Sequence, residues 1–266
     1  MLTLSDQEFS QFQTWLYNVA GIHMSVAKKP LICGRLAKRL QEFQLASYGE
    51  YFSLLQSGRA PGEAQIAIDL LTTNETHFFR EPKHFDFLRA RVLAEHPRGR
   101  TFRVWSAACS SGEEVYTIAM VLHSVLGDAP WDVTGSDLST RVLERAQRGQ
   151  YPMQRAEEIP REYLQEYCLK GVGAQDGTLL IDRKLRARTR FAQVNLKLAP
   201  PALGEFDVIF LRNVMIYFDL PMKQSVVARL AGLLKPGGWL FIGHSENLQG
   251  VSSELEGIAP AIYRKP

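Results

Sequence analysis

The chain has 266 residues, of which 45% are hydrophobic and 22% are charged, and its formal net charge is only +3. This composition is that of a globular protein with one large or two small domains, and the charge gives no global support for nucleic-acid binding. The first residues do not resemble a leader segment, and no apolar run approaches the ~20 residues that a membrane span needs. We therefore expect a cytoplasmic protein with no nucleic-acid partner and no membrane insertion.

Three cysteines, Cys33, Cys109 and Cys168, are odd in number and far apart in the chain. This usage is typical of a reducing compartment, and the spacing matches no metal-ligand pattern, so we expect no metal site. Cys109 is interpreted as a small packing residue rather than as a redox centre.

Residues 1–72 are predicted to form an N-terminal helical domain. Two apolar runs with helical spacing would face a shared core: Phe9, Phe12, Trp15, Leu16 and Val19 in the first, and Leu31, Ile32, Leu36, Leu40 and Phe43 in the second. Pro61-Gly62 interrupts the bundle before a short helix over Glu63–Leu71. A polar linker over residues 73–82 then leads into a helix over Pro82–His96.

Residues 83–266 are predicted to form a doubly wound α/β domain with a mostly parallel sheet, because apolar strands alternate with amphipathic helices. The first strand follows Thr101 and breaks into small residues before an acidic pair opens a helix. The further expected elements are strands over Trp131–Ser136, Phe206–Leu211 and Trp239–Gly243, helices over Arg141–Arg148 and Met222–Leu234, a sharp turn over Lys235–Gly238, and an antiparallel edge strand over Ala261–Arg264.

One region departs from this alternation and predicts an inserted antiparallel β-subdomain over about 160–194. Its expected strands are Leu164–Leu169, Thr178–Ile181 and Ala187–Val194, with glycine-rich turns between the first two. The outer strand of such an insert is an open edge. Either a partner strand pairs with it, or it is protected by the nearby charges Arg183, Lys184, Arg186, Arg188 and Arg190.

The small residues Ala107–Gly112 predict a nucleotide-binding turn, because they let a ligand approach the backbone at the start of a helix. Asp137 follows the second strand about 25 residues later, where an acidic residue conventionally accepts ribose hydroxyls. It could also serve as the N-cap of the next helix. The third strand delivers Arg212, Asn213 and Tyr217 to the same carboxyl edge of the sheet, where ligands bind.

Five segments together resemble the CheR family of chemotaxis receptor methyltransferases over nearly the whole chain: TNETHFFRE at 73–81, SAACSSGEE at 106–114, Gly135-Ser136-Asp137, RNVMIYFD at 212–219 and LKPGGWLFIGHSEN at 234–247. The resemblance implies a class I methyltransferase-like fold and the cofactor S-adenosyl-L-methionine, with S-adenosyl-L-homocysteine as product. It also implies that the substrate is a glutamate on the cytoplasmic helices of bacterial chemoreceptors, converted to its γ-methyl ester.

By this resemblance, a set of polar residues would surround the cofactor: Asn74, Thr76, Arg80, Glu113, Asp137, Asn195, Leu196, Arg212 and Asn213. Glu113 could meet the cationic amino group of the cofactor, and asparagine side chains suit purine edges. Arg80 could also hold the incoming carboxylate, and Tyr217 could flank the sulfonium, so we assign both to catalysis. Arg80 could instead be a domain-interface salt bridge, and Tyr217 a packed aromatic residue.

The helix beginning near Pro30 places Arg35, Lys38 and Arg39 on one basic face, with Lys28 and Lys29 at its start. Such a face is commonly a solvated surface, but the family resemblance favours docking of an acidic receptor helix. The β-subdomain resembles the part of the family that, in some members, binds the receptor's C-terminal peptide at its sheet edge.

Three other functions compete with this interpretation. A methyltransferase for nucleic acid or a small molecule shares the sheet and the turn, but Arg212-Asn213-Val214-Met215 does not match the segment that amino-methylating nucleic-acid enzymes carry there. A nicotinamide dehydrogenase would need three spaced glycines in the turn. A cofactor-binding scaffold without turnover is disfavoured by the presence of Arg80, Asp137 and Tyr217. His244 is interpreted as structural.

Overall fold

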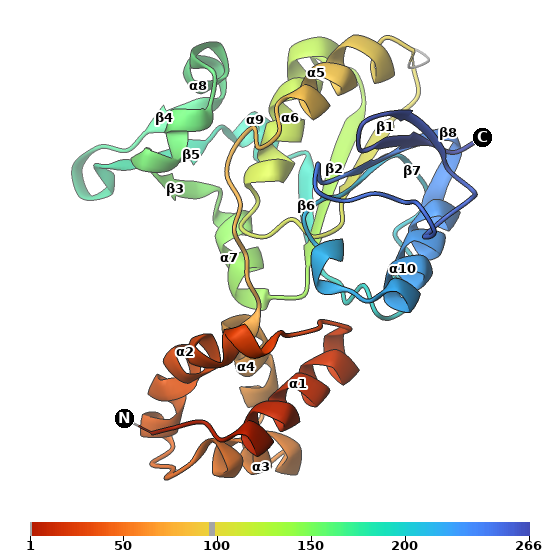
Figure 1. The fold of residues 1–266 in the computed structure, drawn as a ribbon. Coiled ribbons are helices and arrows are strands. Elements are labelled where there is room, and N and C mark those ends of the chain that lie inside the picture. Colours follow the sequence, from red (N-terminus) through yellow and green to blue (C-terminus); the bar gives the residue numbers. More distant parts are fainter. Residues whose placement is uncertain (1, 96–98) are drawn as a thin grey trace.

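The computed structural model describes residues 2–95 and 99–266. Its N-terminal part is helical, as predicted, and lies below the rest of the molecule in Figure 1. The helices are α1 (Asp6–Ala20), the 3-10 turn η1 (Val26–Lys28), α2 (Lys29–Glu42), α3 (Tyr48–Ser57) and α4 (Glu63–Leu71). They enclose a core of their own, in which Phe12, Leu16 and Leu36 are fully buried. The predicted apolar stripes therefore face inward.

The remaining chain forms a seven-stranded sheet with the order β6-β2-β1-β7-β8-β10-β9. The strands are β1 (Phe102–Ser106), β2 (Trp131–Asp137), β6 (Thr189–Gln193), β7 (Phe206–Leu211), β8 (Leu234–Ile242), β9 (Glu256–Ala259) and β10 (Ile262–Arg264). The first five in spatial order are parallel, and β10 is antiparallel to both β8 and β9. The predicted mostly parallel sheet is confirmed.

Helices cover both faces of this sheet. Along β7, Val208 and Phe210 pack into one core with α5 (Lys83–Phe87), the π-turn η2 (Leu88–Val92) and α6 (Glu113–Leu126), whereas Ile209 and Leu211 pack into the other with α10 (Leu220–Leu233). α7 (Thr140–Arg148) follows β2. The predicted helix over Pro82–His96 is thus shorter, and His96 lies outside the described residues. None of the described helices is long and apolar enough to cross a membrane.

Two features on the β8 side of the sheet differ from the prediction. β10 pairs with β8 as expected, but β9 lies outside it and forms the edge. The expected turn over Lys235–Gly238 is a bulge within β8, because Phe206 pairs with Leu234 and Val208 already pairs with Trp239. Gly237 adopts a φ of 75° in this bulge, a conformation that glycine tolerates best.

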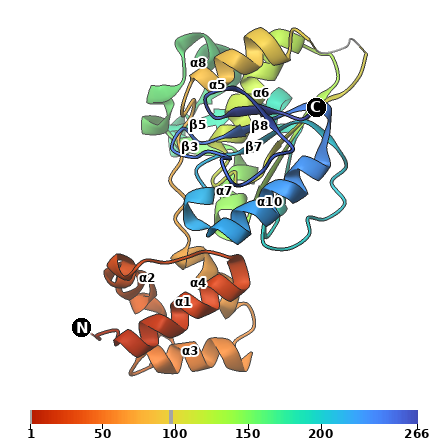
Figure 2. The same cartoon turned by 45° about the vertical axis from the view of Figure 1, so that its right-hand side comes forward.

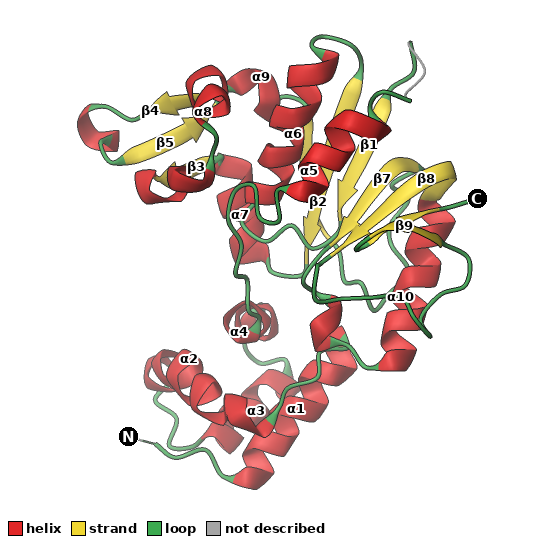
Figure 3. Cartoon of the chain, turned by 45° about the horizontal axis from the view of Figure 1, so that its top comes forward, coloured by secondary structure: helices red, strands yellow, loops and turns green. Residues whose placement is uncertain are grey.

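The inserted β-subdomain is smaller and earlier in the chain than predicted. It is a three-stranded sheet with the order β3-β5-β4, formed by β3 (Gln150–Pro152), β4 (Cys168–Lys170) and β5 (Thr178–Ile181), and it projects from the large sheet in Figure 3. The 3-10 turns η3 (Met153–Glu158) and η4 (Gly173–Gln175) and the helix α8 (Arg161–Tyr167) connect its strands. The prediction of a strand from Leu164 is therefore wrong for the residues up to Tyr167.

The assignment of Ala187–Val194 to the insert is also wrong, because β6 pairs in parallel with β2 and belongs to the large sheet. The helix α9 (Arg183–Arg186) separates it from β5, so the two strands do not form a hairpin. The charges expected to protect the insert lie on α9 and around β6, the outer strand of the large sheet. The edges of the insert itself are β3 and β4.

Candidate cofactor site

The strand order changes direction at β1, which lies between β2 and β7 in the sheet. A crevice is expected at the carboxyl ends of the strands at such a point. The helical domain covers this edge, as the turned view in Figure 2 shows. A cleft with about 980 Å³ of empty space, the solvent at its mouth included, lies between them.

The cleft is lined by three parts of the chain. The helical domain contributes Ala20, Ile22, Lys28 and Leu71, the following linker contributes Thr72–Thr76 and Arg80, and the sheet domain contributes Ala107, Ala108, Ser110, Glu114, Asp137, Leu138, Val194–Leu196, Arg212–Val214, Tyr217 and Phe218. Of the cofactor and catalytic residues expected from the sequence, all but Glu113 lie on this wall.

The turn between β1 and α6 is fixed by backbone hydrogen bonds to neighbouring strands. The Cys109 N–H donates to the Ser136 carbonyl at 2.8 Å, and the Ser110 N–H donates to Asp137 Oδ2 at 2.9 Å. Gly112 has a φ of 93°, and a Cβ there would lie 2.8 Å from Ala146 Cβ, so the turn requires glycine. Burial raises the pKa of the Cys109 thiol well above its usual value, which fits a packing role.

Asp137 ends β2 with its carboxylate almost buried at the cleft. Its oxygens accept from the N–H groups of Ser110 and Ser139, at 2.9 Å each, and every carboxylate oxygen has a second lone pair. Burial raises the pKa of Asp137, and the hydrogen bonds from these backbone groups offset part of the rise. The carboxylate can therefore accept further donors, such as ribose hydroxyls.

The two glutamates that open α6 lie in different places. Glu113 is 1% exposed and bonds Ser111 Oγ at 2.7 Å, and burial raises its pKa. Glu114 lines the cleft, accepts from Ser106 Oγ at 2.7 Å and forms an ion pair with Arg212, also at 2.7 Å. The expectation that Glu113 faces the cofactor is not met, because helical rotation turns its neighbour toward the cleft.

Arg212 is a buried brace between the linker and the sheet domain. Its guanidinium forms ion pairs with Glu114 at 2.7 Å and with Glu81 Oε2 at 3.0 Å, and it donates to the Arg80 carbonyl. Desolvation raises the pKa of Glu81, but the adjacent positive charge of Arg212 outweighs this and holds the pKa below its usual value. Glu81 is thus ionised and fixed in place at neutral pH.

The linker crosses the cleft mouth and is bonded to the sheet domain along its length. The Asn74 carbonyl accepts from Ser110 Oγ at 2.8 Å, and the Thr76 carbonyl accepts from the Arg155 guanidinium at 2.6 Å. The Arg80 guanidinium donates to the Glu75 carbonyl within the linker itself. Arg80 therefore remains at the cleft wall rather than serving as a bridge to the helical domain.

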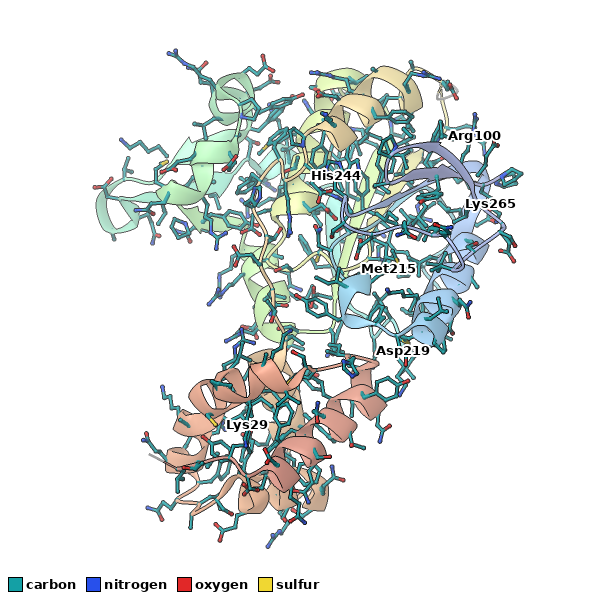
Figure 4. The ribbon with its side chains drawn as sticks, in the orientation of Figure 1. Lys29, Arg100, Met215, Asp219, His244 and Lys265 are labelled. Atoms are coloured by element: carbon teal, nitrogen blue, oxygen red, sulfur yellow. The ribbon has the colours of Figure 1, made fainter. Side chains whose placement is uncertain are left out.

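The opposite wall joins the sheet domain to α1. The Asn195 amide donates to the Val19 carbonyl at 2.7 Å, so its side chain holds the helical domain. Tyr217 lies on the 3-10 turn η5 (Met215–Tyr217), lines the cleft and has Lys28 Nζ 4.8 Å from its ring centroid. Figure 4 labels Asp219 at this junction, where it accepts a hydrogen bond from the Tyr17 hydroxyl at 2.7 Å.

The basic face predicted for receptor docking is largely engaged within the protein. Arg35 donates to the carbonyls of Leu70, Leu71 and Thr72 and so caps the end of α4. Arg39 forms ion pairs with Glu42 and the buried Glu63. Lys38 is exposed. Among the three predicted docking residues, only Lys38 presents its charge to solvent, because Arg35 and Arg39 make the contacts described above.

The sequence reasoning missed the part of the cleft wall that the helical domain supplies, including Ala20, Ile22 and Leu71. Ala20 and Leu71 end the helices α1 and α4 and share the periodicity of a core, and Ile22 lies in the following loop, so the sequence pattern alone gives these residues no separate signal. The sequence alone does not indicate which of the two adjacent residues, Glu113 or Glu114, lines the cleft. Lys28 also lines the cleft, although the sequence pattern places its charge at the start of the docking face.

The doubly wound sheet, the acidic residue at the end of β2 and the cleft beneath the linker match the SAM-binding methyltransferase domain that the comparison finds over residues 74–262. The comparisons identify its family. Residues 74–262 match the CheR methyltransferase SAM-binding domain, and residues 7–72 match the CheR methyltransferase all-alpha domain. The chain belongs to the CheR methyltransferase family.

Two curated relatives cover nearly the whole chain. Chemotaxis protein methyltransferase 2 of Pseudomonas aeruginosa is 40% identical over 97% of this chain and 92% of the relative. Chemotaxis protein methyltransferase of Escherichia coli is 43% identical over 92% of this chain and 86% of the relative. Among solved structures, the N-methyltransferase NodS from Bradyrhizobium japonicum, in complex with S-adenosyl-L-homocysteine, has a TM-score of 0.43 at 14% identity, covering 77% of this chain and 97% of that chain.

The residues of the cleft fit this cofactor. Asp137 offers free lone pairs on an almost buried carboxylate, as ribose hydroxyls require, and Glu114 offers a carboxylate to an ammonium group. The small side chains of Ala107 and Ala108 leave the backbone of the turn accessible.

Proposed function

We propose that this methyltransferase esterifies glutamate side chains on the cytoplasmic helices of bacterial chemoreceptors and acts in the cytoplasm. The observation that carries the proposal is the position of Arg80 on the wall of the cofactor cleft. A guanidinium there attracts and orients a carboxylate, which is the acceptor that a glutamate supplies. The names of the two curated relatives support the same reaction class.

The reaction needs positioning more than proton transfer. S-adenosyl-L-methionine supplies a methyl group on an electrophilic sulfonium and leaves as S-adenosyl-L-homocysteine. The acceptor glutamate is already an anion at neutral pH, so no general base is required. Arg80 orients its carboxylate, the Tyr217 ring flanks the cleft, and the linker excludes water from it. Each of these contributions comes from a residue on the cleft wall.

We assign cofactor binding to the predicted residues on the wall, with one change. Asp137 takes the ribose hydroxyls, and Glu114 takes the amino group in place of Glu113. The other predicted residues that surround the cofactor are Asn74, Thr76, Arg80, Asn195, Leu196, Arg212 and Asn213. Because the side chain of Asn195 already bonds the Val19 carbonyl, its backbone is the part that faces the ligand.

We further propose that receptor recognition involves Lys38 and the edge strand β4. Leu169 on β4 and Val172 just after it are 53% and 78% exposed, although both are apolar. An unpaired strand edge with exposed apolar side chains suits the addition of an extended peptide, such as a receptor C-terminus. Titration with synthetic receptor C-terminal peptides tests this, and no saturable binding to any of them would contradict it.

The main test is the transfer of labelled methyl from S-adenosyl-L-methionine to receptor-bearing membranes. Release of the label as methanol by base would identify an ester. Arg80→Ala and Tyr217→Ala variants should lose turnover while keeping most of their affinity for S-adenosyl-L-homocysteine. Unchanged turnover in either variant would end the catalytic assignment of that residue, and label that resists base would exclude the ester.

A further inference from the structure

Beside the cofactor cleft, three side chains converge that the proposed reaction does not use. Glu81 ends the linker, His84 lies on α5, and His244 follows β8 and is labelled in Figure 4. One ligand atom from each lies within 4.8 Å of the others. Glu81 Oε2 is 3.5 Å from His84 Nδ1 and 4.0 Å from His244 Nε2. The cluster thus gathers around one carboxylate oxygen.

His84 is 1% exposed, and neither of its ring nitrogens has a hydrogen-bond partner among the described residues. A buried polar group without a partner costs free energy and calls for a ligand or another explanation. A buried imidazole nitrogen without a hydrogen-bond partner is a ligand that metal ions such as zinc bind.

We propose that Glu81, His84 and His244 form a binding site for a divalent transition metal of the zinc class, and that the metal competes with Arg212 for Glu81. Two imidazole nitrogens and one carboxylate oxygen are a ligand set that zinc prefers. Tetrahedral ligands at 2.0–2.1 Å from the metal lie about 3.4 Å from one another, which the Glu81–His84 pair already approaches. The side chain of His244 is 44% exposed and can move to complete the set.

The competition follows from the contacts of Glu81 Oε2. This oxygen is 3.0 Å from the Arg212 guanidinium and accepts from the His244 N–H at 3.3 Å, so both of its lone pairs are in use. A metal ion on the same oxygen displaces the guanidinium from it. The formal charges of Glu81, Glu114 and Arg212 add up to −1. This net negative charge attracts a cation to Glu81.

Displacing Arg212 from Glu81 loosens the brace between the linker and the cleft wall, because the same guanidinium holds the Arg80 carbonyl and Glu114. Metal binding should therefore weaken cofactor binding. By thermodynamic reciprocity, the cofactor must weaken metal binding by the same factor. No local sequence pattern indicates this site, since its ligands come from three separate segments.

The first test is titration of the metal-stripped protein with Co²⁺ and then Zn²⁺, with no methyl donor or receptor present. We expect the visible absorption of a tetrahedral Co²⁺ site, without a thiolate charge-transfer band, and its loss when Zn²⁺ is added. His244→Ala should weaken Zn²⁺ binding by at least about 10-fold. His23→Ala, an exposed histidine on the helical domain, is the matched control and should bind as the parent does.

The second test measures the affinity for S-adenosyl-L-homocysteine with and without saturating Zn²⁺. We expect the metal to weaken it by about 5-fold or more in the parent protein and to leave it unchanged in His244→Ala. Equal Zn²⁺ affinity in the parent and His244→Ala, or a thiolate band with Co²⁺, overturns the site. Zn²⁺ binding that leaves the affinity for S-adenosyl-L-homocysteine unchanged overturns the competition. The Co²⁺ result does not depend on the proposed function, because no methyl transfer is measured.

Discussion

Glu113 and Glu114 are adjacent in the sequence, but only Glu114 lines the cleft. Replacing Glu114 with Gln removes a charge that we assign to the cofactor's amino group. We expect about 10-fold weaker binding of S-adenosyl-L-homocysteine, the usual loss for one hydrogen bond to a charged group. Isothermal titration calorimetry gives the affinity. Glu113→Gln is the matched control, and a larger loss in that variant would reverse the assignment.

Asp137 makes cofactor binding pH-dependent. Burial raises its pKa in the free protein, and ribose hydroxyls that donate to the carboxylate stabilise its charged form. The complex therefore holds fewer protons than the free protein near that pKa. Affinity for S-adenosyl-L-homocysteine should fall as the pH drops through this acidic window, which lies above the ordinary aspartate pKa of 3.8, and should be flat well above it.

Asp137→Asn tests this directly by affinity measurements at a series of pH values. The variant should bind about 10-fold more weakly at neutral pH, because hydrogen bonds to a charged acceptor are replaced by neutral ones. Its affinity should lack the acidic dependence of the parent. An equally steep dependence in the variant would show that another group titrates.

At the scale of elements, the helical domain supplies the N-terminal cap of a helix in the sheet domain. Asp69 on α4 accepts from the N–H and the hydroxyl of Thr140, at 3.0 and 2.8 Å, at the first residue of α7. The adjacent Ser139 makes no side-chain cap. Asp69 of the helical domain, rather than Asp137, therefore caps α7. This contact between the domains places α4 against the end of β2.

Asp69→Ala should destabilise the protein by about 1–2 kcal/mol, the usual cost of losing an N-cap. It should also weaken binding of S-adenosyl-L-homocysteine, because Leu71 and Leu138 on either side of this contact line the cleft. Denaturant unfolding and calorimetry measure the two effects. Asp69→Asn, which keeps an acceptor oxygen, is the control, and equal losses in both variants would contradict the capping role.

Strong local patterns predict the bounds of individual helices and strands, but they do not predict which strands pair with each other. The apolar run Phe206–Leu211 and the helix Glu63–Leu71 have the predicted bounds. The pattern of Ala187–Val194 indicates a strand, but its predicted place in the insert is wrong, because pairing depends on the long-range contact with β2 rather than on local propensity. β3 has three residues and is too short to show alternation.

At the scale of the whole molecule, the cofactor cleft is a property of two domains that fold around separate cores. The sheet domain's part of the site was predictable, since the carboxyl ends of parallel strands meet at one edge, where Asp137 ends β2 and Arg212 directly follows β7. The helical domain's part was not, because the docking of α1 depends on contacts such as Asn195 with Val19, 176 residues apart in the chain. Such contacts leave no local pattern.

Contacts within the helical domain decide which basic residues of α2 can meet a receptor. Arg35 caps α4 and Arg39 pairs with the buried Glu63, so charge reversal at either position would first disturb the fold. Lys38→Glu should leave stability unchanged and lower kcat/KM for receptor methylation by about 2- to 5-fold, as expected for one exposed charge. The difference should shrink as ionic strength approaches ~1 M, where the Debye length is about 3 Å.

Methylation rates of receptor-bearing membranes across a salt series, with Lys223→Glu on α10 as the control, measure this effect. Both substitutions change the net charge equally, so a general electrostatic effect would slow both variants alike. A local role for the α2 face slows only Lys38→Glu, because the Debye length of about 8 Å at physiological salt confines the interaction to nearby acidic groups. Equal rates for the two variants at low salt would remove α2 from the docking surface and leave β4 as the proposed receptor contact.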